Sequence, residues 1–121
     1  MKRTTFLLAL TAAVAAIAAL AVPALATTSA QTVRVTETSY RIALSAKPKA
    51  GTVRFVIRNA AEDDAHDMVL RGGGKTFRSR TLGPGAGQAI VAKLKKGARY
   101  TFWCSIGSHA EKGMRGSFVA R

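Results

Sequence analysis

The feature that most constrains this chain is the alternation of apolar and polar residues in short runs. Residues 52–58 alternate most clearly, with Val53, Phe55 and Ile57 on one side and Arg54 and Arg58 on the other. A period of two is typical of a β-strand with one buried face. Further strands are expected at residues 32–35, 40–44, 66–70, 76–81, 88–94, 100–104 and 116–120.

Turn residues separate these runs. Glycine or proline occurs in residues 47–51, 72–74, 82–85 and 95–97, and no segment after the first 26 residues has the periodicity of an amphipathic helix. The polar stretch 59–65, with Glu62, Asp63 and Asp64, is expected to be a surface loop. Seven or eight short strands with regular turns predict a single all-β domain, an antiparallel sandwich or barrel.

The first 26 residues are typical of an export signal. Lys2 and Arg3 are followed by the uncharged residues 6–22 and then by Ala24-Leu25-Ala26. This order predicts a secretory signal peptide over 1–26, cleaved after Ala26, and a folded domain over 27–121. The protein is therefore expected to be exported, in the periplasm or outside the cell. A retained membrane anchor and a second cleavage site after Ala30 are the alternatives.

The expected domain is strongly basic. Residues 27–121 keep 17 of the 19 basic residues against six acidic ones, a net charge of +11. In an exported protein, this charge favours an acidic protein partner or an anionic surface over nucleic acid. Because the basic residues are interleaved along the strands, the solvated outer face of a sheet explains most of them. The chain is expected to be monomeric, with peripheral membrane association as an alternative.

One cysteine, two histidines and a methionine carry the chemistry. His109 follows Cys104 by five residues, and Met114 follows His109 by five, in a loop between two expected strands. His66 lies about forty residues upstream, at the start of another strand. Strand ends that are distant in sequence meet at one end of a sandwich, so the four side chains are expected to converge. A lone thiol in an exported protein is prone to oxidation unless it is buried or bound to another group.

This set of donors indicates copper. Two imidazoles and a thiolate with a weak axial thioether form the blue-copper arrangement, whereas zinc rarely binds a thioether. Alone, Cys104 would more often be a small buried hydrophobe and Met114 a filler of gaps in the core. Their spacing in a β-rich chain outweighs these readings. One copper ion per chain is predicted, with the ligands His66, Cys104, His109 and Met114.

The chain resembles the cupredoxins, the small blue-copper proteins such as plastocyanin, azurin and auracyanin. The resemblance covers the expected domain and lies in Asn59…His66 and in the segments 82–85, 96–104 and 113–116. It implies an eight-stranded Greek-key β-sandwich that transfers electrons. It also implies nitrogen ligation by His66 and His109, a Cys104 thiolate and an axial Met114.

One residue departs from the cupredoxin pattern. Asp67 occupies a position where the family commonly has asparagine. Its carboxylate is expected to accept hydrogen bonds from the backbone or hydroxyl of Ser105, beside the thiolate. The added negative charge should favour Cu(II) and lower the reduction potential.

A one-electron carrier between redox partners is the leading functional hypothesis. Its electron port is expected at the outer edge of His109, among Ile106, Gly107 and Ala110, on a small surface suited to transient contact. A copper carrier or chaperone with the same ligands is the first alternative. A metal-free basic binding module, in which Cys104 is only structural, is the second. An enzyme is not expected, since one small domain with a closed metal site offers no evident substrate pocket.

Overall fold

The computed structural model describes residues 20–25 and 29–121. Most of the predicted signal peptide, including Ala26, falls outside these residues, so the leader and its cleavage remain predictions. Within the described part of the chain, no helix is long and apolar enough to cross a membrane. The described strands are β1 (Gln31–Thr38), β2 (Arg41–Leu44), β3 (Gly51–Asn59), β4 (Val69–Gly72), β5 (Lys75–Arg78), β6 (Gly87–Leu94), β7 (Arg99–Trp103) and β8 (Arg115–Val119).

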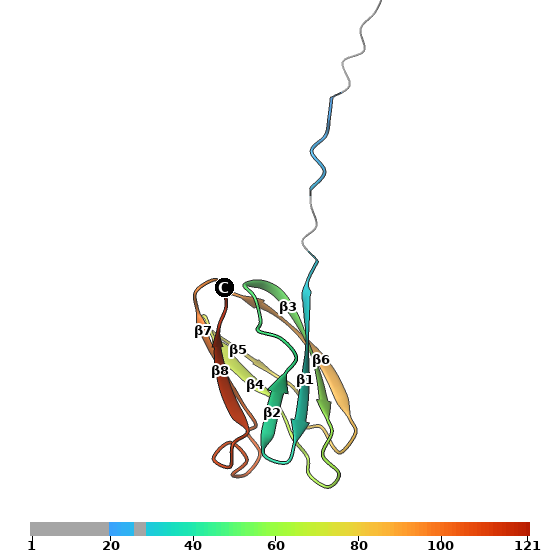
Figure 1. Ribbon diagram of the computed structural model, residues 1–121, viewed down its shortest axis with the longest axis vertical. Helices are drawn as coiled ribbons and strands as arrows, with labels where there is room; N and C mark the ends of the chain where they lie inside the picture. Colours follow the sequence, from blue (N-terminus) through green and yellow to red (C-terminus); the bar gives the residue numbers. More distant parts are fainter. Residues whose placement is uncertain (1–19, 26–28) are drawn as a thin grey trace, which may run out of the picture.

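These strands form two four-stranded sheets packed face to face (Figure 1). The first has the order β2-β1-β3-β6 and the second the order β5-β4-β7-β8. The all-β sandwich predicted from the alternation is confirmed. The run at 66–70 is split: His66 forms an isolated bridge with Leu82, and β4 begins only at Val69. Tyr40, expected to begin a strand, lies in the turn before β2.

One strand pair differs from the antiparallel expectation. β1 and β3 are parallel, with Val33 opposite Phe55 and Val35 opposite Ile57. The short strand β2 returns along the outer edge of β1, and residues 45–50 then carry the chain back to the level at which β1 began. β3 therefore starts at the same end as β1 and runs in the same direction. Such a long-range pairing leaves no local sequence signal.

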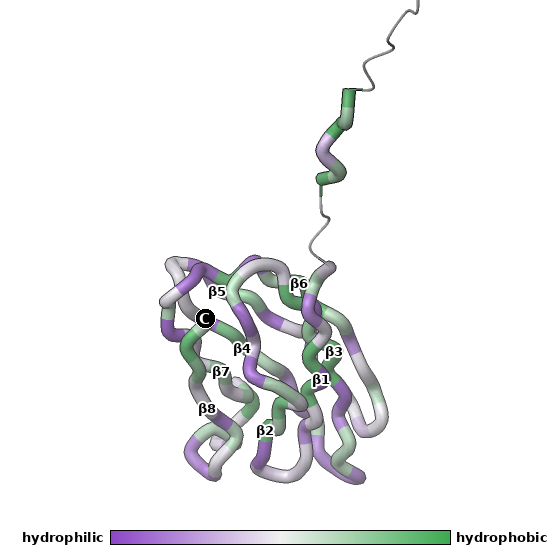
Figure 2. The backbone as a smooth tube through the Cα atoms, turned by 45° about the horizontal axis from the view of Figure 1, so that its top comes forward, coloured by the Kyte–Doolittle hydropathy of each residue, from purple (hydrophilic) through white to green (hydrophobic). Residues whose placement is uncertain are grey.

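The core lies between the two sheets and follows the predicted alternation. Val53, Phe55 and Ile57 are buried, while Arg54 and Arg58 are exposed. Figure 2 shows how apolar and polar residues alternate along the backbone. In the segment Phe102-Trp103, where one ring was expected to point inward, Phe102 is buried and Trp103 is partly exposed.

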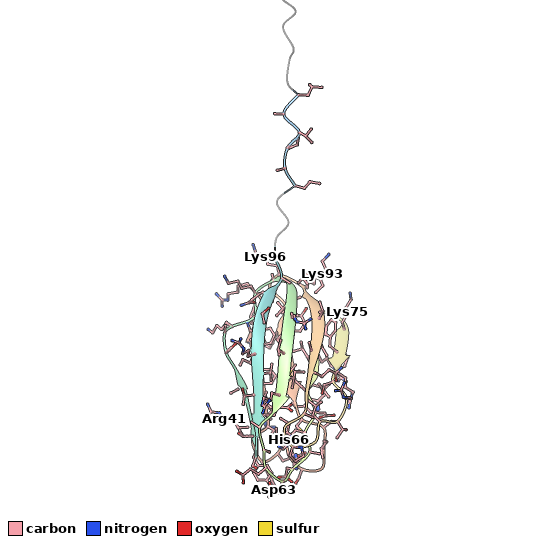
Figure 3. The ribbon with its side chains drawn as sticks, turned by 90° about the vertical axis from the view of Figure 1, so that its right-hand side faces the viewer. Arg41, Asp63, His66, Lys75, Lys93 and Lys96 are labelled. Carbon is pink, nitrogen blue, oxygen red and sulfur yellow. The ribbon has the colours of Figure 1, made fainter. Side chains whose placement is uncertain are left out.

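The two ends of the sandwich carry different loops. At one end β1 and β3 finish, and the connections 60–68, 79–86 and 104–114 meet there (Figures 1 and 3). We call this the donor end, because these loops hold all four predicted ligands. The opposite end contains the start of β1, the hairpin turns 73–74 and 95–98, and the connection 45–50.

Candidate metal centre

His66 is fixed by contacts between two loops of the donor end. Its backbone N–H donates to the carbonyl of Leu82 at 3.0 Å, and the Leu82 N–H donates back to the His66 carbonyl at 2.7 Å. The buried amide of Asn59 connects the same loops, since its Nδ2 donates to the carbonyls of Asp64 (2.7 Å) and Leu82 (2.9 Å). These hydrogen bonds fix the polar stretch 59–65 to the loop that contains Leu82.

The other three predicted ligands lie in one loop whose ends are joined. Cys104, directly after β7, donates its backbone N–H to the carbonyl of Met114 at 3.0 Å. The Met114 N–H in turn donates to the carbonyl of His109, also at 3.0 Å. We call residues 104–114 the ligand loop. Its backbone hydrogen bonds hold Cys104, His109 and Met114 close together at the donor end.

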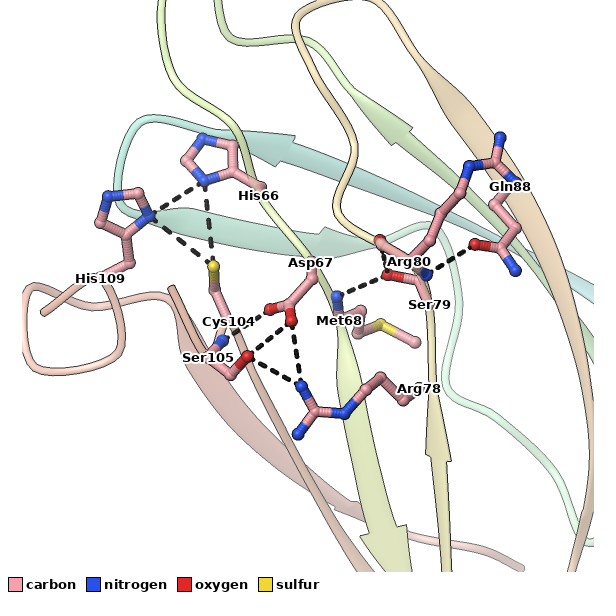
Figure 4. A network of polar contacts seen from close by, with 10 residues as sticks. All are labelled: His66, Asp67, Met68, Arg78, Ser79, Arg80, Gln88, Cys104, Ser105 and His109. Atoms are coloured by element: carbon pink, nitrogen blue, oxygen red, sulfur yellow. Dashed lines mark hydrogen bonds and ion pairs between the residues drawn. The ribbon is translucent and has the colours of Figure 1, made fainter. Parts of the chain in front are cut away.

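Three donor atoms converge between the two loops (Figure 4). Nδ1 of His66 lies 3.2 Å from Nδ1 of His109, and the Cys104 sulfur lies 4.0 Å and 3.7 Å from these two nitrogens. Metal–ligand bonds are about 2.0–2.1 Å to nitrogen and about 2.3 Å to sulfur, as for zinc. Each separation is shorter than the two corresponding bonds end to end, so one ion can contact all three atoms. Among the described residues, no other such group is found.

Burial separates the four predicted ligands into two kinds. His66, Cys104 and Met114 are 0%, 1% and 0% exposed, whereas His109 is half-buried. The site is therefore closed toward the core and open only past the His109 ring. Met114 is buried, and its backbone is hydrogen-bonded to two other predicted ligands, Cys104 and His109. Its axial role remains a prediction.

Asp67 connects the two ligand-bearing loops, as the sequence suggested. Its Oδ1 accepts from the Ser105 backbone N–H at 2.6 Å, and its Oδ2 accepts from the Ser105 hydroxyl at 2.6 Å. Sequence reasoning did not find the second partner residue, Arg78, whose Nη1 lies 3.3 Å from Oδ2 and also donates to the Ser105 hydroxyl at 3.0 Å. The carboxylate beside Cys104 is therefore partly neutralised.

Burial favours the neutral forms of the two buried donors, the Cys104 thiol and the His66 imidazole. It raises the pKa of the Cys104 thiol, an effect that backbone hydrogen bonding partly opposes. Burial, followed by the neighbouring His109, lowers the pKa of His66. A neutral imidazole has the free lone pair that a metal requires. The thiol must lose its proton to bind, so metal binding should release a proton.

Tyr40 is a neighbour of the site that the alternation did not reveal. Its ring lies edge-on to the His109 ring with centroids 5.5 Å apart, and its hydroxyl accepts from Nζ of Lys112 at 3.3 Å. A Cβ on Gly113 would come within 3.0 Å of the Tyr40 carbonyl, so the ligand loop needs glycine there to approach the turn. Tyr40 is also the only described non-glycine residue with a positive φ, 64°.

The backbone of Tyr40 should carry measurable strain. Tyr40→Gly is expected to be more stable than Tyr40→Ala by about 1 kcal/mol, because only glycine adopts this conformation without a steric penalty. Both variants lack the ring, so their difference isolates the backbone effect. Urea unfolding of the two metal-free proteins measures it. Greater stability of the alanine variant would show that the turn relaxes and holds no strain.

Glu37 is a second residue that sequence reasoning missed. It lies on the inward face of β1 near the donor end, is fully buried, and neither carboxyl oxygen has a hydrogen-bond partner among the described residues. Burial, and after it the charge of Asp67, raises the pKa of Glu37 to about 7. A carboxyl in such a place is protonated at mildly acidic pH, and ionising it costs folding free energy.

An eight-stranded sandwich with a His-Cys-His donor group at one end has the architecture of a cupredoxin. The expected cupredoxin fold is confirmed by solved structures. A reduced auracyanin from Roseiflexus castenholzii is similar, with a TM-score of 0.64 and 18% identity, over 76% of this chain and 98% of that one. Auracyanin B matches with a TM-score of 0.65 and 18% identity, over 76% of this chain and 89% of the other.

A larger protein contains a related domain. The copper-containing nitrite reductase from Thermus scotoductus matches with a TM-score of 0.55 and 12% identity, over 75% of this chain but only 31% of the reductase. No family model and no curated protein sequence matches the chain. These likenesses establish the fold.

Proposed function

We propose that this protein is an exported blue-copper electron carrier, with one copper ion bound by His66, Cys104, His109 and Met114. The observation that supports this most strongly is the convergence of two imidazole nitrogens and a cysteine sulfur within 4.8 Å of one another. Their softness suits copper, and the cupredoxin fold is one in which such sites occur. When bound, copper supplies a single-electron couple between its +1 and +2 states.

The residues of the chain make the proposed copper site rigid and leave one of its edges exposed to a partner. The ligands lie on backbone that is hydrogen-bonded across the loops, so little rearrangement is needed when the charge of the site changes. His109 is the only predicted ligand with an exposed edge, and Ile106 and Ala110 beside it are partly exposed. An electron would enter and leave past this ring, without making or breaking a bond in the protein.

The closed site favours electron transfer over metal delivery. A copper chaperone must release its ion to a partner, and this requires accessible ligands. Here His66, Cys104 and Met114 are almost completely buried, and Asn59 and Asp67 join the loops above them. Slow exchange of the metal is therefore expected.

The absorption and EPR spectra of the protein with stoichiometric Cu(II) test this proposal. A copper–thiolate site should give an intense visible band and narrow copper hyperfine splitting, and both should disappear and return over a reduction and reoxidation cycle. A colourless protein that exchanges copper rapidly would instead indicate the chaperone. Absence of stoichiometric binding would indicate the metal-free module.

Asp67 should tune the potential of this site. Asp67→Asn is expected to raise the midpoint potential, because a negative charge near the sulfur favours Cu(II). Arg78→Gln is the matched opposite change: it removes the counter-charge of Asp67 and should lower the potential. Shifts on the order of tens of mV are expected, since about 59 mV corresponds to tenfold in a one-electron equilibrium. Equal potentials in wild type and both variants, measured by redox titration, would contradict this role.

Export and the redox partner are parts of the same proposal. The leader predicts a periplasmic or extracellular protein, and the partner is expected to dock over His109. Near this ring, the exposed cations Arg41 and Lys112 lie at the same end as Glu62, Asp63 and Glu111. The acidic partner expected from the net charge remains a prediction, and the mixed charge at the donor end weakens it.

A further inference from the structure

The carboxylate side chains and most of the lysines lie toward opposite ends of the sandwich. All six carboxylate side chains of the protein lie in β1, in the loop 60–68 or in the ligand loop, toward the donor end. Of the seven lysines among the described residues, six lie at the opposite end, where Figure 3 labels three of them. We call these six the lysine end: Lys47, Lys49, Lys75, Lys93, Lys95 and Lys96.

Contacts between separate elements bring these lysines onto one surface. Nε2 of Gln31 donates to the carbonyl of Lys47 at 3.1 Å, and the Lys49 N–H donates to Oε1 of Gln31 at 2.7 Å. Gly51 and Leu94 are opposite each other in the β3–β6 ladder, next to the hairpin of Lys95 and Lys96. A Cβ added to Gly73, in the hairpin of Lys75, would lie 3.3 Å from Cβ of Lys95.

The lysine end contains no Asp or Glu side chain. All six side chains are exposed, and the only ion pair within the described residues, Asp67–Arg78, lies at the donor end. Six like charges on one surface repel one another and favour binding to a surface of opposite charge. The fold does not otherwise require them, because each lies in a turn or on an outward-facing strand position.

A redox partner does not fit this surface. The eight residues of β1 separate the two ends by about 25 Å at roughly 3.3 Å per residue. A protein bound at the lysine end would be held away from the exposed edge of His109. An anionic ligand bound at this end would therefore serve a purpose other than electron exchange.

The surroundings of the lysine end suit a lipid bilayer. β1 begins here, so the chain that precedes Gln31, including the apolar residues 6–22, joins the sandwich at this end. A groove of about 790 Å³ also opens beside it, where Lys47 and Lys49 border the apolar side chains of Leu44, Phe102 and Phe118. A bilayer presents both anionic headgroups and acyl chains, whereas a soluble polyanion presents charge alone.

We propose that the lysine end binds the surface of an anionic phospholipid membrane and thereby directs His109 away from the bilayer. The attraction acts whether or not the leader is retained, and it does not depend on the bound metal. The membrane-bound protein would keep its donor end free for partners.

Sedimentation with lipid vesicles tests this proposal, using the protein as purified after export. Binding to phosphatidylcholine vesicles containing phosphatidylglycerol should exceed binding to phosphatidylcholine alone, and the excess should vanish between about 0.1 M and 1 M salt, as screening requires. Because Lys2 and Arg3 of a retained leader would also favour anionic vesicles, the contribution of the lysine end is taken from variants that share the same leader. The measurement is made with and without copper, so its outcome is independent of the proposed electron transfer.

Two triple variants of equal net charge provide the decisive comparison. K49Q/K93Q/K96Q changes the lysine end, and R41Q/R58Q/R80Q changes exposed cations toward the donor end. The first should lower binding to the anionic vesicles about tenfold or more, and the second less than about threefold. Equal losses would show that only net charge matters and would overturn the proposal. Equal binding to both vesicle types, or a soluble polyphosphate that binds as tightly as the anionic vesicles, would also overturn it.

Discussion

Cys104→Ser is expected to abolish the intense visible absorption of the copper-loaded protein. The thiolate is the only sulfur anion in the proposed site, and the two imidazoles alone would leave a weakly coloured copper complex. The narrow hyperfine splitting in the EPR spectrum should widen at the same time. Copper affinity should fall by several orders of magnitude, because a serine hydroxyl is not ionised at neutral pH. Titration with Cu(II), followed by absorption and EPR, measures both effects.

Ser108→Ala provides the matched control for this experiment. Ser108 lies in the same ligand loop, is exposed, and is not one of the predicted ligands. This variant should keep the visible band and the affinity of the wild type. A Cys104→Ser protein that still binds Cu(II) with an unchanged spectrum would exclude Cys104 as a ligand. If no protein in the series bound copper, Cys104 would be a structural residue of a metal-free module.

Glu37→Gln is expected to make the protein more stable at pH 8 and to leave its stability at pH 4 almost unchanged. Glu37 has a pKa of about 7 in the folded protein, against an ordinary value of 4.5. The folded state therefore binds this proton more tightly than the unfolded chain. The stability of the wild type should fall as the pH rises from about 4.5 to 7, by on the order of 3 kcal/mol.

The difference in the free energy of unfolding between wild type and Glu37→Gln separates the contribution of Glu37 from those of the other titrating groups. The pKa of His66 is lowered, so His66 alone would make stability rise with pH over part of the same window. This contribution is common to wild type and variant and largely cancels in their difference. Urea unfolding of the metal-free proteins at several pH values gives the measurement. A difference that does not change between pH 4 and pH 8 would show that Glu37 titrates normally.

The architecture could be predicted because its signal is local. Each strand that buries one face shows the alternation directly, as in Val53, Phe55 and Ile57, and glycine or proline marks the turns between strands. The parallel pairing of β1 with β3 could not be predicted in this way. It depends on how two segments separated by a hairpin and a loop come together in space, and no nearby residue records it.

The convergence of His66, Cys104 and His109 could also be predicted, since this combination of donors is chemically unusual even without a structure. The neighbours of the site were harder to find. Glu37 interrupts an inward-facing series begun by Val33 and Val35, and extending that period by one step would have identified it as buried. The strain at Tyr40 and the partnership of Arg78 with Asp67 depend on tertiary contacts, for which the sequence alone gives no signal.

The backbone hydrogen bond from Cys104 to Met114 has a consequence for how such a protein can diversify. It closes residues 104–114 into a loop. The flanking strands β7 and β8 therefore pair in a fixed register, whatever residues lie in the loop. Lengthening a closed loop adds only slowly to its entropic cost. Insertions or deletions inside this loop can therefore alter the proposed coordination sphere while the sandwich folds as before, so that the redox properties of a copper-bound site would be free to evolve separately from stability.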